Sequence, residues 1–126
     1  MAEAVREALR ETDQVKSMMN FSQLIKELSP DNAAAAFKTV RETVAGFESM
    51  RFLPMLTYQW GSLDGTKALA AMKDLGGRDS MFNSAATLAG FASTDPEAAK
   101  KWLGENGTPE NRWILDRALV TGLARS

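Results

Sequence analysis

The chain of 126 residues contains no cysteine and no histidine. Without cysteine it forms no disulfide bonds and has no thiolate nucleophile, and without histidine it has no imidazole for acid–base catalysis. Zinc sites are excluded almost entirely, because nearly all of them use cysteine or histidine ligands. No spacing of the remaining acidic and basic residues singles out a catalytic group. The sequence therefore predicts no catalytic residues, no metal site and no cofactor, and a protein that is not an enzyme.

An excess of charge of one sign is also missing. Fifteen lysines and arginines stand against sixteen acidic residues, which gives a net charge of −1, and the two halves of the chain are equally balanced. Proteins that bind nucleic acids need a basic surface to neutralise the phosphates. The composition therefore predicts no nucleic-acid partner.

Long apolar runs are absent. The longest uncharged segment, 80–94, contains several hydroxyl and amide side chains, and the first residues, 1–7, carry charges in place of the apolar centre of a signal peptide. A membrane-spanning helix needs about 20 mostly apolar residues. We therefore expect no membrane insertion by this segment, and the sequence does not indicate a compartment.

Runs with the period-two alternation of strands are missing as well, and helix formers dominate. Capping residues and glycines divide the chain into short segments with one apolar stripe each. The sequence thus predicts an all-α fold in a single domain over 1–126. Pro54 should bend its helix or start a new one. The expected helices are 2–12, 14–28, 30–43, 46–62, 65–75, 80–93, 96–103 and 109–124.

An internal repeat connects these helices. Trp60–Ala68 and Phe91–Ala99 share an aromatic residue, two small residues, a capping aspartate and an alanine in the next helix, at an offset of 31 residues. The last residues, 123–126, repeat 91–94 at an offset of 32. A helical pair of about this length is typical of helical-repeat proteins. Asp64 and Asp95 are accordingly interpreted as helix caps and not as paired catalytic carboxylates.

The segment Phe91–Ala99, with Trp102 behind it, resembles the degenerate W-A-x-x-D-P-x-x-A helical repeats of many bacterial proteins, which are similar to tetratricopeptide and HEAT repeats. Trp60 matches the aromatic residue of this motif, whereas Gly65 replaces its proline. The resemblance covers about residues 14–126. It implies a right-handed, α-solenoid-like stack of seven to eight antiparallel helices and no established catalytic chemistry. In such a stack we expect Trp102 to be mostly buried.

The last predicted helix, 109–124, carries more apolar residues than one stripe requires. We expect uncovered apolar surface there, because each repeat normally buries its stripe on the next. Either the chain is a fragment of a longer repeat protein, or a second copy covers this face. The candidate partner-binding residues are Arg112, Trp113, Val120 and Leu123.

The favoured function is a non-catalytic scaffold for protein–protein interaction, with an unknown protein partner or self-association. Two alternatives remain open. One is a binding site for a small molecule between helices, and the other is a regulatory homo-oligomer.

Overall fold

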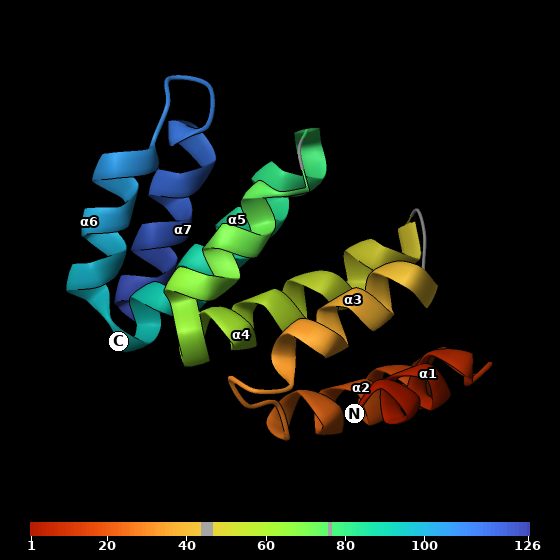
Figure 1. The fold of residues 1–126 in the computed structure, drawn as a ribbon. Coiled ribbons are helices and arrows are strands. Elements are labelled where there is room, and N and C mark those ends of the chain that lie inside the picture. Colours follow the sequence, from red (N-terminus) through yellow and green to blue (C-terminus); the bar gives the residue numbers. More distant parts are fainter. Residues whose placement is uncertain (44–46, 76) are drawn as a thin grey trace. The chain divides into compact units, whose positions relative to one another are not determined.

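A computed structural model describes residues 1–43, 47–75 and 77–126 (Figure 1). The described part of the chain contains seven α-helices and no strand, so the predicted all-α class is confirmed. The helices are α1 (Ala2–Arg10), α2 (Gln14–Lys26), α3 (Ala33–Thr43), α4 (Phe47–Lys73), α5 (Gly77–Thr94), α6 (Pro96–Asn106) and α7 (Arg112–Ala124).

The chain divides into two compact units, which we call unit 1 (Met1–Leu56) and unit 2 (Thr57–Ser126). The boundary between them lies inside α4. Each unit has buried apolar side chains of its own. The expectation of a single domain over 1–126 stays a prediction.

In unit 1, α1 packs against both α2 and α3 (Figure 1). The predicted break near residue 13 is present, and Asp13 caps α2 by accepting hydrogen bonds from the backbone N–H groups of Val15 and Lys16. The core includes an edge-to-face contact between Phe21 and Phe52, with ring centroids 4.9 Å apart. Burial of such aromatic side chains supplies much of the stability of a small helical unit.

The break inside α4 lies at Asp64 and not at Pro54. Asp64 has non-helical backbone angles (φ −154°, ψ 76°), whereas the helix continues through Pro54 without such a departure. The predicted new helix start at Pro54 is therefore wrong. Pro54 is exposed, and its fixed φ is compatible with a helix. The predicted division of this segment between residues 62 and 65 agrees with the kink.

The junction at Asp64 has the same local geometry as the junction at Asp95, which has φ −140° and ψ 76°. Each aspartate accepts a hydrogen bond from the backbone N–H three residues later, at Lys67 (3.4 Å) and Ala98 (3.3 Å). The sequence offset of 31 thus corresponds to a shared backbone conformation. Gly65, which replaces the motif's proline, has a packing reason, because a Cβ there would lie 2.2 Å from the ring of Phe91.

Three glycines in unit 2 mark places where helices cross at close range. A Cβ on Gly90 of α5 would lie 1.9 Å from the carbonyl oxygen of Tyr58 in α4, and one on Gly61 would lie 2.1 Å from that of Thr87. A Cβ on Gly122 of α7 would lie 2.3 Å from the carbonyl oxygen of Ala89 in α5. Small residues are needed where helix backbones approach this closely. Helix α5 therefore contacts α4 on one side and α7 on the other.

Helices α3 and α7 begin with the same capping arrangement. The Asn32 side chain accepts a hydrogen bond from the N–H of Ser29 (2.8 Å), and the Asn111 side chain accepts one from the N–H of Thr108 (2.7 Å). At Thr108 the pattern is reciprocal, because the N–H of Asn111 also donates a hydrogen bond to the Thr108 hydroxyl (3.3 Å), and the two bonds form a capping box. In both segments a proline follows the first residue of the turn. The first turn of each segment is closed by a backbone hydrogen bond to the carbonyl oxygen three residues earlier. The N–H of Asn32 donates to Ser29, and the N–H of Asn111 donates to Thr108. For this reason α3 and α7 begin three residues later than the predicted positions 30 and 109.

The start of α5 also differs from the prediction. The helix begins at Gly77, three residues before the predicted position 80. In the sequence, the glycine pair at 76 and 77 indicates the end of the preceding predicted helix, 65–75. Residue 76 and the predicted helix start at 46 lie outside the described residues, and Gly77 is the first residue of a helix.

Candidate functional site

The solvent face of α7 carries two exposed apolar side chains. Trp113 is 57% exposed and Val120 is 65% exposed. They are seven residues apart, so they lie on the same side of the helix, separated by about 10 Å along its axis. The expected apolar surface at these two positions is present. Their role in binding a partner stays a prediction.

The opposite face of α7 is buried in unit 2. Leu115, Ala118 and Gly122 recur at intervals of three and four residues and are covered by the neighbouring helices. Leu123 lies between the two faces and is half-buried, so it contributes less free apolar surface than the sequence predicted. One helix thus has a covered apolar stripe and a second, uncovered one.

Charged side chains surround the exposed pair. The Arg112 guanidinium lies 3.3 Å from the Asp116 carboxylate, and both side chains are about half exposed. Arg117 lies one residue further, on the same exposed surface. With Arg125, α7 and the residue that caps it carry three arginines and one aspartate. The solvent face of α7 therefore has exposed apolar side chains, with Arg117 and the Arg112–Asp116 ion pair beside them.

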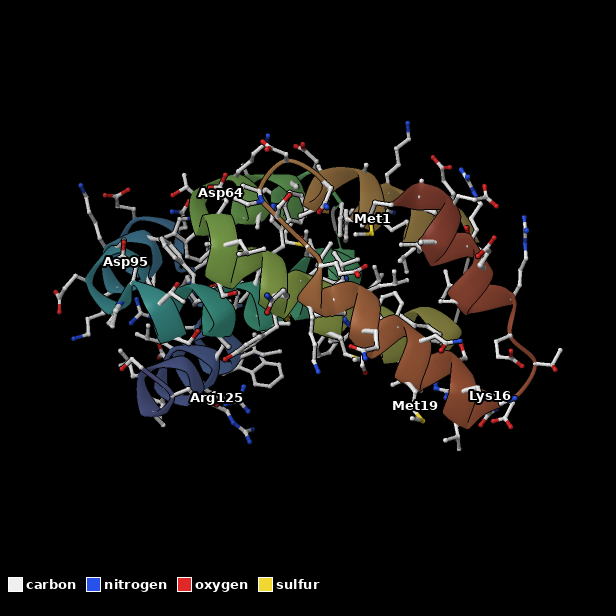
Figure 2. All side chains as sticks on the ribbon, turned by 90° about the horizontal axis from the view of Figure 1, so that it is seen from below. Met1, Lys16, Met19, Asp64, Asp95 and Arg125 are labelled. Atoms are coloured by element: carbon white, nitrogen blue, oxygen red, sulfur yellow. The ribbon has the colours of Figure 1, made fainter. Side chains whose placement is uncertain are left out.

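A second group of polar residues lies at the end of α7. The Arg125 guanidinium carbon lies 5.2 Å from the centre of the Tyr58 ring, in cation–π geometry (Arg125 is labelled in Figure 2). Burial raises the pKa of the Tyr58 phenol, but hydrogen bonds with Arg125 and Ser93 and the positive charge of Arg125 outweigh burial. The pKa of Tyr58 is consequently lowered from its ordinary value of 10.0.

Unit 2 also contains a cleft of about 260 Å³ between the end of α4 and helices α5, α6 and α7. The Lys73 ammonium group lies 5.8 Å from the centre of the Trp102 ring and donates a hydrogen bond to the side-chain oxygen of Asn106. Glu110 is the acidic residue of the lining of this cleft. The complete lining is Lys73, Ser80, Met81, Ser84, Trp102, Asn106, Thr108, Glu110, Asn111 and Leu115.

The expectation that Trp102 is mostly buried agrees with its packing, although one side of the ring stays open to the cleft. Trp102 packs against the core of unit 2 with one side and lines this cleft with another, so it is half-buried. The kinked α4 brings Lys73 close to the Trp102 ring, and this partner could not be identified from the sequence. Trp60, in contrast, is fully buried, at 1% exposure.

The lining of the cleft offers hydrogen-bonding groups, one cation, one carboxylate and the apolar side chains of Met81, Trp102 and Leu115. Within the described ranges, no three acidic side chains come together as ligands for a metal ion. Asp64 and Asp95, which are labelled in Figure 2, each accept a capping hydrogen bond within their own helix start, which agrees with the interpretation of the sequence. The arrangement is suited to binding a small polar molecule.

Sequence reasoning missed two of these groups. Tyr58 meets Ser93 and Arg125 across three helices, and the sole signal in the sequence is that Tyr58 is the single tyrosine. Lys73 meets Trp102 across two helices in the same way. Both groupings depend on pairings between residues far apart in the chain, which helix periodicity does not encode.

Comparison of the chain with protein-family models, with characterised proteins and with solved structures gives no match. In the described part of the chain, no helix combines the length and the apolar character needed to cross a bilayer.

Proposed function

We propose that the chain is a non-catalytic helical-repeat scaffold that binds a partner protein through the solvent face of α7. The observation that carries this proposal is the exposure of Trp113 (57%) and Val120 (65%) on one side of the same helix, with Arg112 beside them. Single exposed apolar residues are common on protein surfaces. A large aromatic residue, an aliphatic residue and arginines gathered on one helix face form the composition found at binding hot spots.

The two matching junctions at Asp64 and Asp95 support the repeat character of the scaffold. Repeat proteins present successive helices as an extended binding surface, and function then lies in the side chains on that surface. The residues of α7 that face solvent are available for this purpose, because Leu115 and Ala118 already hold the helix in place.

A photo-crosslinking amino acid at position 120, expressed in the source cells, tests the proposal. We expect one discrete protein adduct, and none from the same group placed at the exposed Thr66 of α4. The captured protein should then bind the purified chain, and Trp113→Ala should weaken its binding by more than about tenfold. Because Trp113 is exposed, the melting temperature should change little. Equal adducts from both positions, or full affinity of the variant, would contradict the proposal.

A second candidate function is the binding of a small polar molecule in the cleft of unit 2. The observation that favours it is the Lys73 ammonium group poised over the Trp102 ring at the wall of the cleft. A ligand with a carboxylate could bind to Lys73, while Met81 and Leu115 contact its apolar part.

Thermal-shift screening of small carboxylic acids and amino acids tests this second function, with Lys73→Met as the matched variant. A ligand that stabilises the wild-type chain and leaves the variant unaffected supports it. Equal stabilisation of both proteins, or none of either, argues against the cleft as a site.

A further inference from the structure

Unit 2 contains two copies of one helix-crossing surface. In the first copy, Gly90 of α5 lies against the backbone of Tyr58 and Ser62 in α4. In the second copy, Gly122 of α7 lies against Ala89 and Ala92 in α5. Gly122 follows Gly90 by 32 residues and Ala89 follows Tyr58 by 31, which are the offsets of the sequence repeat. In each crossing the glycine and the residue whose carbonyl oxygen it faces are therefore at equivalent positions of successive helices.

A third copy of this surface lies on α7. A further step of 32 residues leads from Ala89 to Thr121 and from Ala92 to Ala124. Both of these residues are exposed, whereas Ala89 and Ala92 are buried beneath α7. Thr121 and Ala124 are small, as the residues of a close crossing must be. They lie on the same solvent face as Val120.

We propose that Thr121 and Ala124 form a docking site for one α-helix of a partner protein, and that this helix carries a glycine at the crossing point and acidic residues beside it. The inference rests on the proposed function and names the partner's chemistry. The glycine is required because, in both occupied copies, a Cβ would lie 1.9–2.3 Å from a backbone oxygen. The acidic residues follow from the surplus of arginine on α7.

A second copy of this chain is a poorer occupant. Its own Gly122 face is buried against Ala89, so it has no free face of the required kind on α7. Two solvent faces of α7 packed on each other would each carry Arg112 and Arg117 against a single aspartate, Asp116. Like charges at an interface oppose association.

A synthetic helical peptide provides the probe. It has the sequence of residues 109–126 with Arg112→Glu and Arg117→Glu, so it retains the face of Leu115, Ala118 and Gly122 that packs on α5. We expect it to bind the full chain in a fluorescence-anisotropy titration, more weakly as salt rises. The matched peptide with Gly122→Leu should bind at least about tenfold more weakly.

Two protein variants locate the binding. Thr121→Tyr places a rigid side chain on the crossing point and should weaken peptide binding by at least about tenfold, while Thr66→Tyr, at an exposed threonine of α4, should leave it unchanged. Equal binding to both variants, or equal binding of both peptides, overturns the inference.

Peptide binding and partner capture at position 120 test the docking site and the proposed function separately. If the peptide does not bind, but crosslinking at position 120 still captures a partner that depends on Trp113, the proposed function stands and the glycine-bearing helix is wrong. If light scattering shows a dimer that Thr121→Tyr dissociates, a second copy is the occupant and the inference is overturned.

Discussion

At the scale of single residues, Tyr58 shows how unit 2 alters the chemistry of a side chain. Its phenol is partly buried, which disfavours the charged form and raises its pKa. Hydrogen bonds with Arg125 and Ser93, and the charge of Arg125, favour the charged form and outweigh burial. The pKa of Tyr58 is therefore lowered overall, and Arg125 makes two of the three contributions that lower it.

Replacing Arg125 with glutamine should therefore raise the pKa of Tyr58. The change removes the guanidinium charge, so burial then acts against fewer favourable contacts. Because the chain has one tyrosine, an ultraviolet absorbance titration reports this group without interference from another phenol. Arg112→Gln, which changes an arginine at the other end of α7, is the matched control. An unchanged titration curve in Arg125→Gln would contradict the assigned contact.

The same shift makes a contribution to stability that depends on pH. Between the lowered pKa of the folded chain and the ordinary value of 10.0, the unfolded phenol still holds its proton and the folded one has lost it. The contribution of Tyr58 to folding therefore grows as pH rises through this window and is lost as pH falls below the folded pKa. Denaturant unfolding measures this contribution. As pH rises through the window, the free energy of unfolding of wild type should increase relative to that of Tyr58→Phe.

At the scale of helices, the close crossings of α5 with α4 and α7 depend on glycine. We expect Gly90→Ala and Gly122→Ala each to lower the free energy of unfolding by roughly 1–3 kcal/mol, because their Cβ atoms would overlap backbone oxygens that cannot move separately. Gly104 in α6 is the matched control. No atom lies within 4 Å of a Cβ built there, so Gly104→Ala should stabilise the helix by about 0.5–1 kcal/mol.

Chemical denaturation of the three variants measures these changes. Destabilisation by Gly104→Ala as large as that by Gly90→Ala would show that loss of glycine is harmful anywhere in these helices. The close-crossing explanation would then be wrong.

The two aspartate junctions allow a second test at this scale. Asp64→Ala and Asp95→Ala each remove a cap and should each cost about 1 kcal/mol. Glu105→Ala, at an exposed acidic position inside α6, should cost little. Thermal unfolding of the three variants provides the measurement. A large effect at one junction and none at the other would contradict their structural equivalence.

Much of the helix arrangement could be predicted from local signals. Asp64 and Asp95 mark helix starts in the sequence, and each caps or interrupts a helix in the structure. The error at Pro54 has a physical origin, since proline disfavours a helix interior and tertiary packing tolerates it on an exposed side. The local cost of proline in a helix can be estimated from the sequence. Whether the surrounding fold keeps the helix intact in spite of that cost cannot be estimated in the same way.

Local signals in the sequence also predicted part of the candidate site. The surplus of apolar residues on the last helix predicted exposure near Trp113 and Val120, because one helix can bury one stripe. It did not distinguish Leu123, whose coverage depends on the neighbouring helices. The pairing of Lys73 with Trp102 was not predictable, since it requires the fold of α4 to be known.

At the scale of the whole molecule, the boundary between the two units falls within a continuous helix. Unit 1 buries Phe21, Val40 and Phe52, and unit 2 buries Trp60, Leu69 and Leu88, among others. Parts of a protein that have separate cores can open separately. We therefore expect unit 1 and unit 2 to have different free energies of local unfolding.

Removing one large side chain from each core tests this expectation. Phe21→Ala should cost about 3–5 kcal/mol and Leu88→Ala about 2–5 kcal/mol, each by leaving a cavity in its own unit. We expect hydrogen exchange, followed by mass spectrometry of peptide fragments, to accelerate in 1–43 for Phe21→Ala and in 77–126 for Leu88→Ala. The acceleration should be confined to the unit that carries the substitution, because the open state there does not require the other core to separate. Met19→Ala, at an exposed position of α2, is the control for unit 1 and should leave both regions unchanged. If either core substitution accelerates exchange equally in both regions, the two units unfold together, and the boundary inside α4 does not separate them energetically.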